Sequence, residues 1–169
     1  PEGATLVGHA RIELAGHDAE QGSRIDASTM NIELTPSGRD VMALDATGGV
    51  TLRLPKLGEN PEQHIRAAVL TGTGTPQIGL TTLRFDHDVE YRESLQAPRS
   101  ESSQVRLVKA ERLEAGVEPG LSALPLAAFH GNVRFEDETR RAEAQKIEYD
   151  VISGTISLEN LSQNDEPIE

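Results

Sequence analysis

Short runs in which apolar and polar residues alternate dominate the sequence, and they predict half-buried β-strands rather than helices. Successive side chains of a strand point to opposite faces, so each run has an apolar face and a polar or charged face. The runs are Ala10–Leu14, Met30–Leu34, Val50–Leu54, Val89–Tyr91, Val133–Phe135, Ile147–Tyr149 and Ile156–Leu158. The pattern therefore predicts an all-β protein whose strands share one apolar surface.

Clusters of glycine, proline and small polar residues separate these runs and predict the turns between the strands. The predicted breaks are Pro36–Gly38, Gly72–Pro76, Glu118–Gly120 and Asp150–Gly154, of which the last has the pattern of a tight hairpin connection. The segment Glu59–Ala68 contains Asn60-Pro61, and it predicts a single helical turn after this proline.

The alternating runs belong to an internal repeat with a period of about 40 residues. The first apolar positions Ala10, Val50, Val89 and Val133 follow the dipeptides Gly8-His9, Gly48-Gly49, His87-Asp88 and Gly131-Asn132. A second signature, alanine followed three residues later by an apolar residue, occurs at Ala27/Met30, Ala67/Leu70, Ala110/Leu113 and Ala144/Ile147. A near-constant period indicates stacked supersecondary units that bury their apolar faces on one another.

The repeat predicts a single domain over residues 1–163, with hairpin units at 8–48, 49–86, 87–130 and 131–163 and a flexible tail at 164–169. The one-residue change of phase between Ala27 and Met30 predicts a β-bulge, which bends a strand and helps a sheet to curl. We therefore expect a repeat-built, open-ended β-jellyroll or folded antiparallel sheet. Its apolar face lines an inner trough, and the small residues Ala27 and Ala144 lie at the corners.

Composition excludes several classes of function. The 169-residue chain has a formal net charge of −12, only 3% aromatic residues and no tryptophan. Phosphate backbones are repelled by such a charge, and single-stranded nucleic acid needs stacking aromatics, so no nucleic-acid partner is expected. There is no cysteine, which excludes disulfides and thiolate chemistry.

The histidines give no support for catalysis or for a metal site. His9, His87 and His130 each stand just before a repeated strand, so we expect them to lie in turns. No pair of histidines has the spacing of a zinc site, and no nucleophile elbow accompanies Asp86-His87-Asp88. The sequence predicts neither an enzyme nor a cofactor.

The last unit, Gly131–Leu158, resembles a repeat of the OstA-like lipopolysaccharide-transport proteins. The elements that carry the resemblance are Gly131-Asn132-Val133, Ala144-x-x-Ile147-x-Tyr149 and Gly154-Thr155-Ile156-Ser157-Leu158. The match is fair over Gly8–Gly49 and Asp86–Gly116, and poor over Leu54–Gly79. There is also similarity to LptC-like members, whose longer chains follow an N-terminal membrane anchor.

This resemblance implies a V-shaped folded sheet in the periplasm of Gram-negative bacteria. Members of the family pass lipopolysaccharide from an inner-membrane ABC transporter toward the outer membrane, hold its acyl chains inside the sheet, and join end to end through edge strands. A periplasmic location, with an anchor or signal before Pro1 left open, is the matching expectation for this chain.

The repeated one-sided alternation leads to a hypothesis about the site. We expect a lipid-binding groove lined by Leu52, Leu54, Leu83, Phe85, Val89, Tyr91, Val133, Phe135, Ile147, Tyr149, Ile156 and Leu158. With few large aromatics to fill a two-sheet interior, a gap can remain for acyl chains. The alternative is a structural or protein-interaction module of the cell envelope whose interior is filled by its own side chains.

Overall fold

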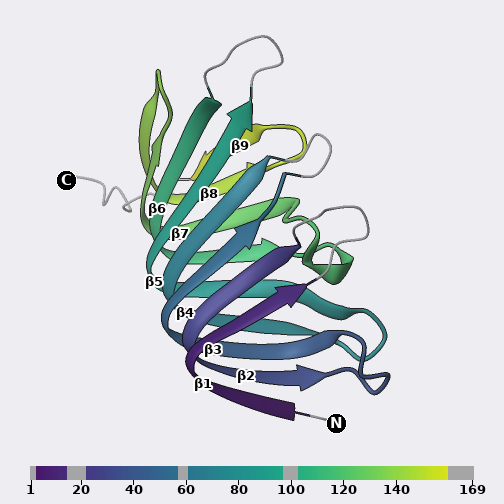
Figure 1. Cartoon of the computed structure of the whole chain (residues 1–169). Coiled ribbons are helices and arrows are strands. Elements are labelled where there is room, and N and C mark those ends of the chain that lie inside the picture. The colour runs from purple at the N-terminus through teal and green to yellow at the C-terminus, as the bar shows by residue number, and fades with distance from the viewer. Residues whose placement is uncertain (1–2, 15–21, 57–60, 97–102, 160–169) are drawn as a thin grey trace, which may run out of the picture.

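The computed structural model describes residues 3–14, 22–56, 61–96 and 103–159, and it confirms the predicted all-β architecture in these ranges. Nine strands form one antiparallel sheet in which spatial order follows chain order (Figure 1). The strands are β1 (Gly3–Leu14), β2 (Ser23–Leu34), β3 (Val41–Leu54), β4 (Glu62–Thr75), β5 (Gly79–Gln96), β6 (Ser103–Gly116), β7 (Leu126–Glu136), β8 (Arg141–Asp150) and β9 (Thr155–Glu159). A short 3-10 turn, η1 (Pro119–Leu121), lies between β6 and β7.

The sheet is folded along one line, so that it consists of two leaves joined at a crease (Figure 1). Leaf A contains residues 10–14, 23–27, 50–54, 62–67, 89–96, 103–110, 133–136 and 141–144. Leaf B contains residues 3–7, 29–34, 41–47, 69–75, 79–86, 112–116, 126–130, 146–150 and 155–159. The arrangement is the predicted V-shaped folded sheet.

The crease is built from the four dipeptides that mark the sequence repeat. Both residues of each pair have positive φ, from 77° and 50° at Gly8-His9 to 81° and 46° at Gly131-Asn132. Each pair adds one residue to its odd-numbered strand. On the β3–β4 ladder Thr47 pairs with Val69 and Val50 with Ala67, so two residues of β3 lie opposite one residue of β4. An added residue bends a strand and increases its twist, so the four bulges together fold the whole sheet.

The predicted change of phase between Ala27 and Met30 is confirmed, because both residues are buried and the β2 pairings shift between Asp26 and Thr29. The extra residue of the bulge lies on the neighbouring strands β1 and β3 and not on β2 itself. The prediction that the repeated strands begin after the dipeptides was wrong. β3 starts at Val41 and passes through Gly48-Gly49. Therefore His9, His87 and His130 lie inside bent strands at the crease rather than in turns between strands.

Two other local predictions were wrong within the described residues. Instead of a helical turn, the segment from Glu62 is the start of β4, where Gln63 and Ile65 face inward and pair with both neighbouring strands. Backbone pairing with two neighbouring strands, together with side-chain burial, stabilises a strand here more than the proline favours a helical turn. The segment Gly72–Thr75 is the end of β4 and not a break. Gly72 is suited to this place because a Cβ there would lie 2.9 Å from Leu80 Cδ2.

The other turns agree with the sequence patterns. Pro36–Gly38 lies in the β2–β3 turn, and Asp150–Gly154 connects β8 and β9, where the Gly154 N–H donates to the Asp150 carbonyl at 2.9 Å. The predicted tail 164–169 lies outside the described residues.

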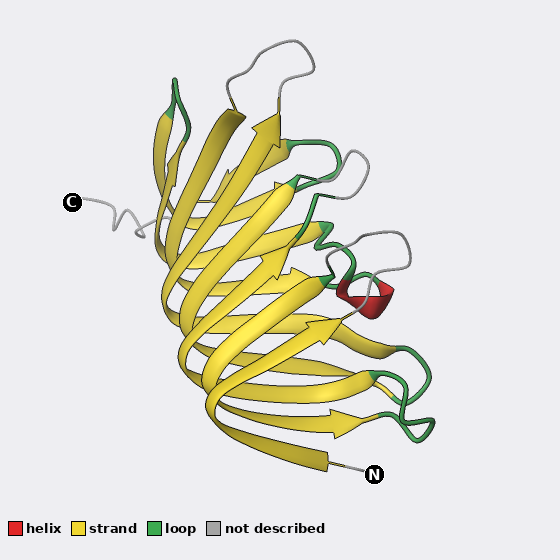
Figure 2. Ribbon diagram, viewed as in Figure 1, coloured by secondary structure: helices red, strands yellow, loops and turns green. Residues whose placement is uncertain are grey.

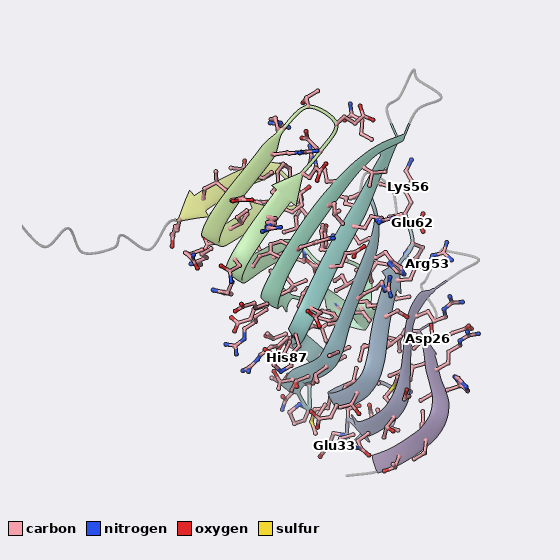
Figure 3. The ribbon with its side chains drawn as sticks, turned by 90° about the vertical axis from the view of Figure 1, so that its left-hand side faces the viewer. Asp26, Glu33, Arg53, Lys56, Glu62 and His87 are labelled. Atoms are coloured by element: carbon pink, nitrogen blue, oxygen red, sulfur yellow. The ribbon has the colours of Figure 1, made fainter. Side chains whose placement is uncertain are left out.

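The hydrophobic core lies between the leaves, and the outer faces are polar. Figure 2 shows the two sets of strands diverging from the crease, with η1 at the open side of the V. On the outer face charged residues form cross-strand ion pairs, such as Arg53 with Glu62 at 3.0 Å (Figure 3). Arg134, Arg141 and Lys146 likewise pair with acidic neighbours on this face.

Candidate functional site between the leaves

The inner faces of the two leaves form a continuous apolar interior. Ten of the twelve residues predicted to line a groove have an exposed fraction of 6% or less. They are Leu52, Leu54, Leu83, Phe85, Val89, Tyr91, Val133, Phe135, Ile147 and Tyr149. The fold thus brings these residues together in one layer between the leaves, where they pack on one another.

The two remaining residues lie on β9, the last strand of the sheet. Ile156 is partly buried against the core. Leu158, two residues further along β9, points to the same face of the sheet but is 53% exposed. The first strand shows the same gradual opening, since Leu6, Ile12 and Leu14 are only partly buried. The apolar interior therefore reaches solvent at both ends of the sheet.

Several inward residues were missed by the groove prediction. They lie mostly on the even-numbered strands and include Ile25, Met30, Ile65, Leu70, Leu113 and Phe129, each almost completely buried. The bulge shifts the alternation by one residue, so the inward parity of one leaf does not continue into the other. The second repeat signature marks three of them, because it places Met30, Leu70 and Leu113, like the predicted Ile147, just beyond the crease on leaf B.

The connection between β6 and β7 covers part of the open side of the V. Leu121 and Leu124 turn inward and are 2% and 1% exposed. Ser23, on leaf A, donates from its hydroxyl to the Leu121 carbonyl at 2.7 Å, and the Val117 N–H donates to Thr81 on leaf B at 2.9 Å. The connection therefore closes the interior between the two leaves at this point.

A polar cluster interrupts the apolar interior on the side of the later strands. The Gln63 side chain donates to Tyr91 Oη at 2.7 Å, and Tyr91 donates to Glu93 Oε2 at 3.0 Å. Tyr149 donates to the other carboxylate oxygen at 2.9 Å and accepts a hydrogen bond from Arg106 Nη1 at 2.8 Å. Glu93 is only 1% exposed, so the cluster satisfies a carboxyl group that is buried in the core.

Burial controls the titration of this cluster. It raises the pKa of Glu93, against the lowering effect of the Tyr149 and Tyr91 hydrogen bonds and the Arg106 charge. Burial, followed by the nearby Glu93 charge, raises the pKa of both tyrosines, so their hydroxyls remain donors at neutral pH. The Tyr91 ring packs edge-on against the rings of Phe129 and Tyr149, with ring centroids 5.5 Å and 6.3 Å apart, and these contacts hold the hydroxyls in place.

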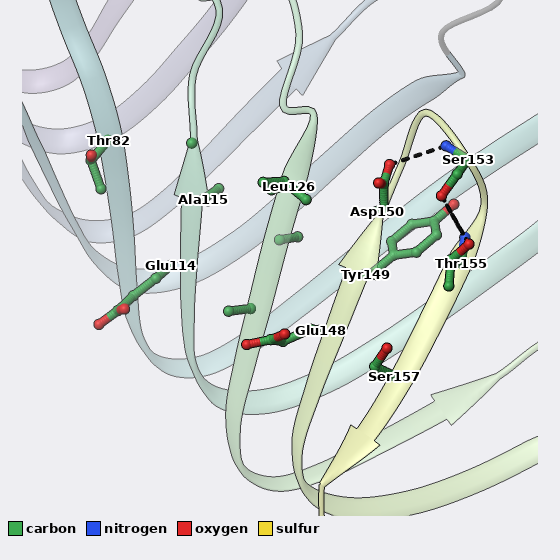
Figure 4. A pocket seen from close by; sticks show the side chains of 13 residues that line it. Thr82, Glu114, Ala115, Leu126, Glu148, Tyr149, Asp150, Ser153, Thr155 and Ser157 are labelled. Atoms are coloured by element: carbon green, nitrogen blue, oxygen red, sulfur yellow. Dashed lines mark hydrogen bonds between the residues drawn. The ribbon is translucent and has the colours of Figure 1, made fainter.

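A groove lies outside this interior, on the outer face of leaf B (Figure 4). It measures about 520 Å³, and its walls include Glu114, Ala128, Glu148 and Ser157, which are cross-strand neighbours with outward parity. Of the twelve residues predicted for the site only Tyr149 borders it. The described residues contain no group of three or more His, Asp or Glu placed to hold a metal ion. They also contain no helix long and apolar enough to span a membrane.

The sheet is open at its two edges in the part of the chain that the structure describes. No described strand pairs with the outer edge of β1, and β9 pairs only with residues 146–150 of β8. Within the described ranges, the second free edge therefore consists of residues 141–145 of β8, on leaf A, and the outer side of β9, on leaf B. Free strand edges are able to pair with a strand of another chain.

Comparison with solved structures supports the same architecture. The fold matches the crystal structure of LptH, the LptA-homologous periplasmic component of the lipopolysaccharide transport device of Pseudomonas aeruginosa, with a TM-score of 0.59. The alignment covers 91% of this chain and 93% of that chain at 14% sequence identity. No known family profile and no curated protein matches the sequence.

Proposed function

We propose that this protein is a non-enzymatic, periplasmic lipid carrier that holds the acyl chains of lipopolysaccharide between its two leaves. The apolar interior, which reaches solvent at both ends of the sheet, is the observation that carries this proposal. The shared fold with LptH, a component of a lipopolysaccharide transport device, supports the choice of ligand. The proposal includes the twelve predicted residues as contacts of the acyl chains, Leu158 among them at the outer end.

Apolar burial supplies the binding energy in this proposal. Each methylene group moved from water into an apolar interior contributes about 0.8 kcal/mol, before the cost of ordering the chain is subtracted. The leaves pack on each other through apolar side chains, and an acyl chain offers contacts of the same kind. Insertion from the partly exposed ends, at Ile12 or Ile156, therefore replaces one set of apolar contacts by another.

We further propose that neighbouring domains extend the interior by pairing with the free edges. An incoming strand gains main-chain hydrogen bonds at either free edge: at β1 it continues both leaves, and at residues 141–145 of β8 it continues leaf A. An inner-membrane ABC transporter then delivers the lipid to one end of such a row of domains. The second candidate function, an envelope interaction module with a filled core, draws its support from the close packing at Leu52 and Leu83.

Site-specific photo-crosslinking tests the lipid-carrier proposal. Phe135 faces inward and is 6% exposed, so replacing it by p-benzoylphenylalanine keeps an aromatic ring at that place. The matched control carries the same group at Arg134, the next residue, whose side chain is 73% exposed on the outer face. With purified lipopolysaccharide we expect a crosslinked adduct from position 135 and none from position 134. Equal labelling at both positions, or none at 135, contradicts the proposal and favours the filled-core module.

A further inference from the structure

The buried polar cluster joins the two leaves to each other across the interior. Glu93 and Arg106 belong to leaf A, on β5 and β6, while Tyr149 belongs to leaf B, on β8. The two hydrogen bonds of the Tyr149 hydroxyl, 2.9 Å to Glu93 and 2.8 Å from Arg106, therefore both cross from one leaf to the other. The hydrogen bonds of Tyr91, by contrast, stay within leaf A, because Gln63 and Glu93 lie on β4 and β5.

The position of the cluster along the sheet gives it a role in access to the interior. Among the strands that the structure describes, only β7 and β8 on leaf A and β9 on leaf B lie beyond it toward the C-terminal edge. Apolar contacts between the leaves can be replaced by the methylene groups of a lipid. The hydrogen bonds to Glu93 cannot be replaced in this way, and breaking them leaves a buried carboxylate without its donors.

We propose that Tyr149, Glu93 and Arg106 form a latch that keeps the leaves together just inside the C-terminal end of the interior. This inference rests on the proposed lipid-carrier function for its biological meaning. The latch divides the apolar interior of the earlier strands from its C-terminal end, where Phe135 and Leu158 lie. A chain passes from one part to the other only after Tyr149 has separated from Glu93 and Arg106.

Two phenylalanine variants separate this role from a general loss of buried hydrogen bonds. Y149F removes one hydroxyl that donates to Glu93 and accepts from Arg106, both across the leaves. Y91F removes one hydroxyl that also donates to Glu93 and accepts one bond, from Gln63, within leaf A. Both variants keep the aromatic ring, and both tyrosines are at most 3% exposed, so the pair is matched in chemistry and burial.

The primary measurement is the distance between spin labels on the two leaves. The chain has no cysteine, so labels attach only to cysteines introduced at the exposed positions Arg92 and Glu148, which adjoin Glu93 and Tyr149. We expect a narrow distribution in the parent and in Y91F, and a broader one displaced to longer distances in Y149F. R106Q, which removes one of the two cross-leaf bonds, is the second variant and should show a smaller displacement. Distributions in Y149F and R106Q that equal the parent's, or equal broadening in Y91F, overturn the latch.

The second measurement uses cis-parinaric acid, a fluorescent fatty acid, as the probe. Loss of hydrogen bonds to charged groups should speed its release from Y149F roughly tenfold relative to the parent, with little change in Y91F. Failure of the parent to bind the probe or purified lipopolysaccharide counts against the proposed function, while the label distances still decide whether the latch exists. Binding with equal release rates in all variants overturns the control of access by the latch.

Discussion

The two halves of the interior hold their leaves together in different ways. Around β2 and β3 the leaves meet through aliphatic side chains, such as Ile25, Met30 and Leu44, each 1% exposed or less. Around β5, β6 and β8 a carboxylate, a guanidinium and two tyrosine hydroxyls lie among the apolar residues. Apolar packing has no preferred direction and lipid can replace it, whereas hydrogen bonds have fixed partners. In the proposed carrier, the earlier strands therefore hold lipid by apolar contacts alone, and the latch in the later strands controls its passage to the C-terminal end.

The strongest test of the apolar half is truncation of a side chain on β3. Leu52 is completely buried, so Leu52→Ala should lower the free energy of unfolding by about 2–5 kcal/mol through lost burial and a cavity. Urea denaturation followed by far-UV circular dichroism measures this loss. The neighbouring Arg53→Ala, on the outer face, should change stability by no more than about 0.5 kcal/mol. Similar effects of the two changes contradict the assignment of the faces.

A second test compares two glycines of the same crease dipeptide. Gly48 and Gly49 both have positive φ, but only at Gly48 would a Cβ meet a neighbour, Ser28 Cβ, at 2.5 Å. Gly48→Ala should therefore cost about 2–4 kcal/mol, from backbone strain plus a steric clash, and Gly49→Ala about 1–2 kcal/mol from strain alone. Thermal unfolding of both variants checks the order. A Gly49→Ala variant that is less stable than Gly48→Ala is the contradicting outcome.

A third test uses the pH dependence of the free energy of unfolding, to which the buried Glu93 in the polar half contributes. Folding raises the pKa of Glu93 above its ordinary value of 4.5, with Arg106, Tyr91, Tyr149 and Gln63 around the carboxyl group. The resulting stabilisation is present below pH 4.5 and is lost as the pH rises through the folded pKa. Glu93→Gln removes this dependence, so the stability of the variant relative to the parent should increase with pH. Parallel stability curves from acid to neutral pH contradict the assignment.

The smallest expected effect concerns the crease in the later strands. The third dipeptide, His87-Asp88, has positive φ at 66° and 51° without any glycine. Glycine adopts this conformation at lower cost, so His87→Gly should raise the free energy of unfolding by about 1 kcal/mol. Differential scanning calorimetry provides the measurement. A lower melting temperature for His87→Gly counts against strain at this position.

The folded sheet could be predicted from the sequence because its main features are local. Strict alternation of apolar and polar residues at Val50–Leu54 and Val133–Phe135 predicts strands. The recurring dipeptides mark the positions at which this alternation is interrupted. The course of the strands through these dipeptides could not be predicted in the same way. Glycine pairs usually indicate turns, and only the register of β3 against β4 shows that Gly48-Gly49 is a bulge within a strand.

The polar cluster could have been found from parity but not from residue type. Glu93 lies an even number of residues after Val89 and Tyr91 on the same strand, so it points inward with them. Gln63 points inward with Ile65 for the same reason. Charged residues in strands usually face solvent, which is why Glu93 and Arg106 were not expected inside. Their hydrogen bonds to Tyr149 depend on the folding of leaf B onto leaf A, and local sequence does not contain this information.

The central claim, that acyl chains lie between the leaves, is tested most directly by methyl NMR on the unmodified chain with bound lipopolysaccharide. Leu52 and Leu83 face inward and are completely buried, whereas Ile78 and Ile152 are 52% and 75% exposed. Nuclear Overhauser contacts from the lipid methylene protons to Leu52 and Leu83, and none to Ile78 or Ile152, are the predicted result. Contacts confined to the outward methyl groups, with the inward signals unchanged, contradict the account.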